Sequence, residues 1–225
     1  MATTISGSTG FLDKTLLDKL LIACGILSSL LYVASNIFIP MQYPGYSLAS
    51  HTVSELSAIG SPTRQLWVQV LSVYSILVIV FGWGVCRVAG KKRSLRVAGI
   101  LIAVYAVIGF FWPPMHTREV LAAGGGTFTD TLHVVFTLAT VPLMLLVMAF
   151  ASAALGKSFR LYSLISLVIV IFFGVLTGLS SPQMEANLPT PWMGVWERIS
   201  IGAYMLWVLA LSVLLLRKTG GKMMI

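Results

Sequence analysis

Charged residues are scarce in this sequence. They make up 10% of the 225 residues, whereas 57% are apolar, and a soluble domain has about 25% charged residues. So few ionic groups cannot cover a surface that faces water, which excludes an ordinary soluble globule. The high apolar content also excludes a disordered chain. The composition therefore predicts an integral membrane protein.

Cysteine and acidic residues are also few. Two cysteines, Cys24 and Cys86, are not enough for a disulfide scaffold. Seven acidic residues against fifteen Lys and Arg leave a net charge of +8. The basic residues form short clusters between long apolar runs, which favours anionic lipid headgroups over nucleic acid as the partner. The sequence contains no P-loop, dinucleotide fingerprint, haem motif or GxSxG motif.

Six apolar stretches dominate the sequence, and each could cross roughly 30 Å of hydrocarbon as a helix. A spanning segment must satisfy its own backbone polar groups, so each is expected to be helical. A GxxxG motif at 174–178 is typical of close helix packing. We predict an all-α integral membrane protein, one domain over 1–225, folded as a six-helix transmembrane bundle with spans at 17–39, 65–88, 95–112, 131–155, 161–179 and 192–216.

The basic residues are divided unevenly between the two sides of these spans. Only Arg64, Arg118 and Arg198 fall on the side opposite the chain ends. The other twelve are Lys14, Lys19, Arg87, Lys91, Lys92, Arg93, Arg96, Lys157, Arg160, Arg217, Lys218 and Lys222. Lys and Arg are enriched in cytoplasmic loops, so we expect both termini inside and the protein in the cytoplasmic (inner) membrane.

Acidic and histidine residues gather on the outer side instead. All three histidines and five of the seven acidic residues lie there. Ionisable residues at membrane depth are functional candidates by default. We therefore expect an outward-facing polar cluster made of His51, Ser54, Glu55, His116, Arg118, Asp130, His133, Glu197 and Arg198.

Helix capping offers a simpler explanation for part of this cluster. Glu55 fits a capping box in which its side chain reaches back to the backbone of Thr52. Thr129 is predicted to cap the fourth span, and Thr190 is predicted to open the sixth. Capping does not explain residues placed deeper, where a polar group needs a partner, namely His133, Glu197 and Arg198.

Three interpretations of the cluster remain open. His51, His116 and His133 could hold zinc with an open water position, although the sequence lacks HExxH spacing. Alternatively, the polar residues could form a hydrogen-bonded network that holds the outer ends of the helices together. In the third interpretation they line a metal-free pocket for a headgroup or another ligand.

Three segments of the sequence resemble a known family. They are Ser54–Gly60 after the first span, Leu132–His133 opening the fourth, and Gly194–Arg198 opening the sixth. In this order they resemble the domain of unknown function 998 membrane family, over about 40–220. The resemblance implies a six-helix prokaryotic membrane protein without an assigned activity. Members often carry Asp after the third span, where this chain has Met115 and His116.

These observations lead to three functional hypotheses. The one we favour is a non-catalytic accessory subunit of a membrane complex or a lipid-binding bundle. The second is an outer-leaflet hydrolase or transferase for a lipid-like substrate, with His51, His116 and His133 as metal ligands or acid–base groups. In that enzyme Glu55 or Asp130 would activate water, and Arg118 or Arg198 would hold an anionic headgroup. The third is a small transporter.

Overall fold

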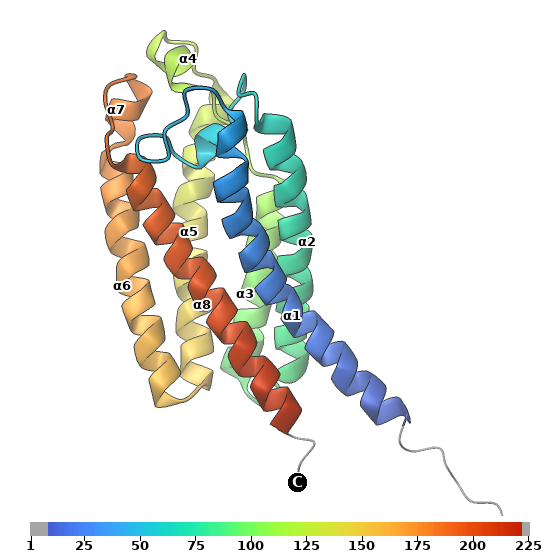
Figure 1. The fold of residues 1–225 in the computed structure, drawn as a ribbon. Helices are drawn as coiled ribbons and strands as arrows, with labels where there is room; N and C mark the ends of the chain where they lie inside the picture. The colour runs from blue at the N-terminus through green and yellow to red at the C-terminus, as the bar shows by residue number, and fades with distance from the viewer. Residues whose placement is uncertain (1–8, 222–225) are drawn as a thin grey trace, which may run out of the picture.

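The computed structural model describes residues 9–221 and consists of helices joined by loops (Figure 1). Within this range six helices are long and apolar enough to cross a membrane. They are α1 (Thr9–Phe38), α2 (Arg64–Val88), α3 (Arg93–Phe110), α5 (Phe128–Ala154), α6 (Lys157–Leu179) and α8 (Met193–Gly221). The chain is therefore a multi-pass helical membrane protein.

Each predicted span coincides with one of these helices, but several helices extend beyond the apolar stretch. α1 begins at Thr9 rather than at 17, and α6 begins at Lys157 rather than at 161. The helical backbone satisfies its own hydrogen bonds whatever the side chains are, so a helix can continue into a charged segment. Hydropathy alone therefore predicts only the part of each helix that can lie in hydrocarbon.

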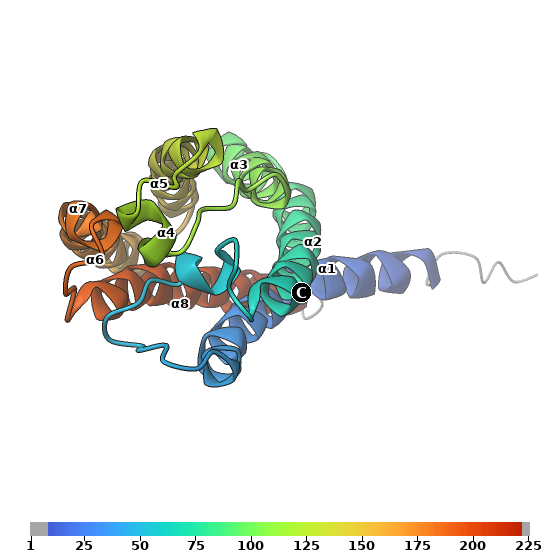
Figure 2. The same ribbon diagram turned by 90° about the horizontal axis from the view of Figure 1, so that it is seen from above.

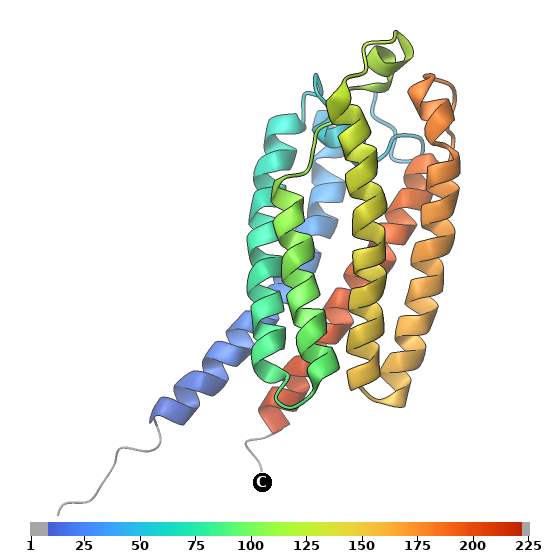
Figure 3. The same ribbon diagram turned by 180° about the vertical axis from the view of Figure 1, so that it is seen from behind.

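The six long helices form a closed ring when viewed along the bundle (Figure 2). Each packs against its neighbours in the order α1, α2, α3, α5, α6 and α8, and α8 packs against α1. Short turns at 89–92 and 155–156 lie at one end, here called the turn end (Figure 3). The opposite end, here called the loop end, carries η1 (Pro40–Gln42), η2 (Ser54–Ser57), α4 (Arg118–Ala122) and α7 (Ser181–Glu185).

The inside of the ring is filled with large apolar side chains. Trp207 and Phe81 are fully buried there, and Tyr204 is 1% exposed. The indole N–H of Trp207 donates to the hydroxyl of Ser163, 2.8 Å away, so this polar group is also satisfied. The centre of the bundle is thus a packed core.

The outer faces of the helices are also apolar. Leu138, Leu164, Val168 and Leu206 are each more than half exposed. Contact with lipid tails accounts for such a surface, because hydrocarbon does not penalise exposed apolar side chains as water does. The bundle is therefore apolar on both its inner and its outer side.

Basic residues surround the turn end. The predicted positions from Lys14 to Lys218 lie on the helix ends and turns there, whereas Lys222 lies outside the described residues. Arg87 pairs with Asp18 of α1 at 2.7 Å, and the ammonium of Lys92 donates to the carbonyl of Ala154 at 3.1 Å. The described ends of the chain also lie at the turn end (Figure 1).

Candidate functional site

A buried ion pair joins three segments of the loop end. The Arg118 guanidinium donates through Nε and Nη2 to the two carboxylate oxygens of Glu55, at 2.7 and 2.8 Å. The exposed fractions are 6% for Arg118 and 3% for Glu55. Arg118 also donates to the hydroxyl of Thr190 at 3.2 Å and the carbonyl of Ser50 at 3.3 Å. The pair therefore holds together η2, α4 and the segment before α8.

The surroundings of Arg118 favour its charged form. Burial by itself lowers the pKa of Arg118, but its hydrogen bonds to Glu55 and the charge of Glu55 outweigh that effect and raise the pKa. Glu55 also accepts from the backbone N–H of Thr52 at 2.7 Å and from its hydroxyl at 3.0 Å. The predicted contact from Glu55 back to Thr52 is thus present, and Arg118 is an additional partner.

Arg198 forms a second set of contacts, mainly with backbone oxygens. Its Nη1 donates to the carbonyls of Leu48, His51 and Gly194 at 2.9–3.1 Å. Its Nη2 donates to the Tyr46 hydroxyl at 2.6 Å. Burial raises the pKa of Tyr46 although Arg198 opposes this, so the hydroxyl keeps its proton. Arg198 therefore ties the start of α8 to the loop that follows α1.

Glu197 lies beside Arg198 and has a different partner. Its carboxylate accepts from the backbone N–H of Val53, directly before η2. Both charged residues at the start of α8 thus bind the 46–53 segment, and each does so mainly through main-chain groups. The sequence indicated that they needed partners, but backbone N–H and carbonyl groups have no side-chain signature.

His51 belongs to the same segment and binds within it. Its Nδ1 accepts from the backbone N–H of Ser47 at 3.0 Å, and its ring stacks on Tyr46 with the ring centroids 5.1 Å apart. Burial lowers the pKa of His51, although the nearby Glu55 opposes this. The ring is therefore neutral at pH 7 and can accept the Ser47 hydrogen bond.

His116 and Asp130 form another pair, which connects the loop after α3 to α5. Asp130 lies 2.9 Å from His116 Nδ1 and accepts from the His116 backbone N–H at 2.6 Å. The same carboxylate accepts from the backbone N–H of Thr127 at 2.7 Å, which completes a capping box. The prediction of Thr129 as the cap was wrong, because α5 begins at Phe128 and Thr127 is its N-cap.

His133 joins the loop after α3 to η2, in the loop after α1. Its Nδ1 lies 2.8 Å from the carbonyl oxygen of Pro113, and its Nε2 lies 3.2 Å from the hydroxyl of Ser54. This carbonyl oxygen favours a proton on Nδ1, because two lone pairs would otherwise repel each other. In the neutral ring Nε2 can then accept from Ser54. The Trp112 indole N–H also points at Nδ1, 3.1 Å away, and can donate to it only when that nitrogen carries no proton, so the two neighbours favour opposite tautomers.

The structure therefore brings the predicted residues together in separate pairs. His51, His116 and His133 each have their own partners, described above. Among residues 9–221, no group of three or more His, Cys, Asp or Glu side chains is arranged to hold a metal ion. The zinc interpretation thus finds no support among the described residues.

A small cavity lies beside the Arg118 contacts. It has a volume of about 200 Å³ and is lined by Ser180, Gln183, Pro189, Thr190, Trp192 and Trp196. Thr190, predicted to open the last helix, instead uses its hydroxyl to donate to the carbonyl of Ser50 at 2.9 Å, and α8 begins at Met193. Sequence reasoning placed Thr190 correctly near a helix start but missed its role in joining Arg118 to Ser50.

Comparison with known proteins identifies a family and no individual relative. Neither the curated proteins nor the solved structures include a significant match to this chain. A family model described as "Protein of unknown function (DUF998)" matches residues 26–214. That segment contains all the paired residues of the loop end and all but the ends of the six-helix ring. The chain therefore belongs to the DUF998 family.

Proposed function

We propose that this protein is a non-catalytic membrane protein, an accessory subunit or lipid-binding bundle, whose loop-end residues hold the helices in one arrangement. The observation that carries this proposal is the buried bidentate pair of Glu55 and Arg118, whose remaining partners are also groups of this chain. A carboxylate and a guanidinium used in this way have few positions left for a substrate.

The proposal includes an orientation. The basic turn end faces the cytoplasm of a cell bounded by an inner membrane, and the loop end faces outward. Both termini then lie inside. The anionic lipids of the cytoplasmic leaflet are the expected neighbours of the turn end.

The test is the size of the protein in its native membrane. We expect a tagged chain, solubilised in mild detergent, to migrate as a stable complex larger than its own 24.3 kDa and bound detergent, with at least one further subunit in fixed ratio. Glu55→Gln should weaken the complex because the outer helix ends lose their fixed geometry. Recovery of an isolated monomer in every mild detergent would contradict the subunit hypothesis.

A second candidate function is that of an outer-leaflet hydrolase or transferase, and one contact favours it. Ser54 Oγ lies 3.2 Å from His133 Nε2, while the opposite ring nitrogen faces the Pro113 carbonyl. A hydroxyl beside an oriented imidazole is the arrangement of an activated nucleophile. Ser54 would attack the ester carbonyl of a lipid, and its proton would pass to His133 and then to the departing alcohol. Water would release the acyl group as the free acid.

Covalent labelling separates the two candidates. An enzyme of this kind should react with a fluorophosphonate probe at Ser54, and Ser54→Ala and His133→Ala should abolish labelling. Ser57→Ala is the matched control, because Ser57 lies in the same helix and its hydroxyl donates to the Ser54 carbonyl. Absence of labelling in the unmodified protein would leave the non-catalytic proposal in place.

A further inference from the structure

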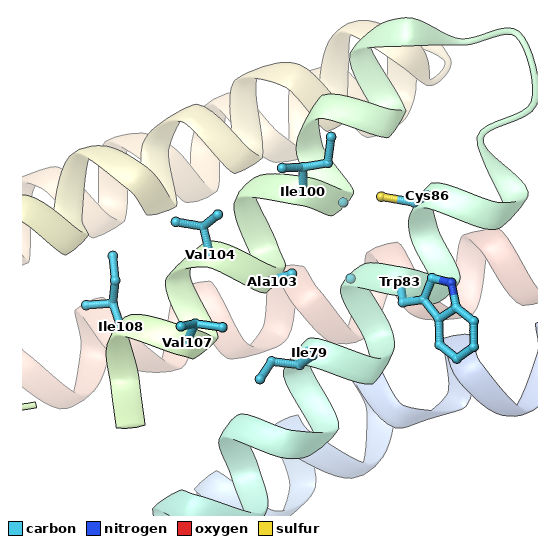
Figure 4. Close-up of a pocket in the computed structure, with 10 residues that line it drawn as sticks. Ile79, Trp83, Cys86, Ile100, Ala103, Val104, Val107 and Ile108 are labelled. Carbon is cyan, nitrogen blue, oxygen red and sulfur yellow. The ribbon is translucent and has the colours of Figure 1, made fainter. Parts of the chain in front are cut away.

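An open groove runs between α2 and α3 on the outside of the ring (Figure 4). It has a volume of about 430 Å³ and is lined by Ile79, Trp83 and Cys86 of α2 and by Ala103, Val104 and Val107 of α3, among others. The two helices approach closely at Gly82 and Gly99, where a Cβ on Gly82 would lie 2.7 Å from the Gly99 carbonyl oxygen. The glycines form the floor and the larger side chains form the walls.

The walls of this groove face away from the core. Trp83 is 54% exposed, and Val104 is 42% exposed. Its lining is apolar, and it lies between two helices that are apolar enough to span a membrane. Hydrocarbon matches such a lining, whereas water inside it would lack hydrogen-bond partners.

One end of the groove lies next to a cluster of cations. Cys86 marks that end, and the α2–α3 turn follows it directly. Arg96, in the first turn of α3, donates to the carbonyl of Gly90 at 2.8 Å, and Lys92 donates to the carbonyl of Ala154. Lys91 and Arg93 are exposed and make no ion pair or side-chain hydrogen bond with another described residue. Two cations are thus available where the groove reaches the membrane surface.

We propose that this groove holds an acyl chain of an anionic phospholipid, whose headgroup phosphate lies at Lys91 and Arg93. The apolar lining suits the chain, and the two exposed cations beside it suit a negative headgroup. The site belongs to the leaflet at the turn end. It deepens the lipid-binding form of the proposed function and rests on it only for the kind of lipid, because the proposed function assigns no residue at the turn end to binding.

Native mass spectrometry of the detergent-purified, delipidated protein tests this proposal, with phosphatidylglycerol and phosphatidylcholine added separately. We expect one retained phosphatidylglycerol and weaker retention of phosphatidylcholine. Lys91→Gln with Arg93→Gln should reduce retention of phosphatidylglycerol by about tenfold, because two attractive charges are lost. Lys157→Gln with Arg160→Gln is the matched control, since it removes two exposed cations from the start of α6, at the same end of the bundle.

A second variant tests the groove itself. Ala103→Phe should fill the groove and reduce retention of both lipids, whereas Val168→Phe, on the exposed face of α6, should not. Thermal unfolding checks that each variant is folded, and the charge variants supply the test if Ala103→Phe does not fold. The proposal would be overturned if the two double variants lost phosphatidylglycerol retention equally. It would also be overturned if a folded Ala103→Phe variant retained both lipids as the unmodified protein does. A wild-type dimer that Ala103→Phe converts to a monomer would assign the groove to a second copy instead, and would also overturn it.

Discussion

Glu55 illustrates how one carboxylate can serve two structural roles. It satisfies the Thr52 backbone N–H at the start of η2, and it neutralises Arg118, 63 residues further along the chain. Breaking a buried ion pair by removing one partner is costly, because the other charge stays buried without compensation. The stability of the loop end should therefore depend strongly on this side chain.

We expect Glu55→Gln to lower the free energy of unfolding in detergent by about 3 kcal/mol. The substitution keeps the size of the side chain but removes the charge that faces Arg118. The control is Glu119→Gln, since Glu119 is an exposed carboxylate in α4 next to Arg118, and it should change stability by less than about 0.5 kcal/mol. If denaturant unfolding gave the same loss of stability for Glu55→Gln and Glu119→Gln, the Glu55–Arg118 pair would stabilise the protein no more than a surface charge does.

The stability of the protein should fall in mild acid partly through His51. Its pKa is lowered in the folded state, first because burial disfavours the charged ring. The unfolded chain then binds more protons below its ordinary pKa of about 6.5. Stability is lost as the pH falls through that value, and the loss levels off below the folded pKa. Protonation also prevents Nδ1 from accepting the Ser47 N–H.

Unfolding measured between pH 8 and pH 5 checks this expectation. The His51→Gln variant should have a flatter pH dependence than the unmodified protein over the same range, because the titrating ring is gone. The groups whose charges act on His51 are Glu55, Arg118 and Glu119. Parallel curves for the variant and the unmodified protein would contradict the assignment to His51.

The local contacts of these residues could be predicted from sequence, but their distant partners could not. The Glu55–Thr52 contact follows from a spacing of three residues. The Glu55–Arg118 pair depends on how the loops fold over one another. Arg198 was expected to need a partner, yet it binds the carbonyls of Leu48 and His51, and every residue carries a carbonyl. The identity of the residues that accept from Arg198 could therefore not be predicted from their side chains.

At the scale of helices, hydropathy located all six long helices, because a segment that crosses lipid must be apolar over about 20 residues. Helix starts were less predictable, since Thr127 and Thr129 are equally good capping residues and tertiary contacts decide between them. The GxxxG motif in α6 predicted the packing only in part, since a Cβ on Gly174 would lie 3.6 Å from the Ser200 hydroxyl of α8. A Cβ on Gly178 would meet nothing within 4 Å, whereas Gly82 and Gly99 lie at a close helix crossing without such spacing.

We expect Gly82→Ala to destabilise the protein by about 1–3 kcal/mol, the usual cost of overpacking. The added methyl would meet the backbone of α3, including the Ala103 nitrogen at 2.9 Å, and a backbone cannot move aside cheaply. Gly178→Ala is the control, and it should be neutral or stabilise by up to about 1 kcal/mol. Thermal unfolding in one detergent compares them, and a larger loss for Gly178→Ala would refute this view of the crossing.

At the scale of the whole molecule, the bundle has two different ends. The basic turn end, and the gathering of acidic and histidine residues at the loop end, both follow from the charge distribution along the sequence. The order of helices around the ring does not, because apolar faces of similar hydropathy carry no information about their neighbours. The centre of the bundle is packed with large side chains, Trp207 and Phe81 among them.

The proposed orientation can be measured by cysteine labelling. In a variant in which Cys24 and Cys86 are replaced by Ser, a single new cysteine is introduced by Glu119→Cys or Lys91→Cys; both positions are exposed. We expect an impermeant maleimide added to intact cells with a permeable outer envelope to label the first. The second should react only after the inner membrane is opened. The reverse pattern would place the loop end in the cytoplasm.

The ring of helices closes between its first and last members. α1 packs against α8, and the Ser212 hydroxyl of α8 donates to the Ile22 carbonyl of α1. During synthesis, α1 enters the membrane long before its final neighbour exists. The inner face of α1 must therefore contact lipid or an insertion factor until α8 emerges from the ribosome. A chain that stops before α8 would keep that face open, which is a feature by which quality-control proteases can distinguish unfinished copies from complete ones.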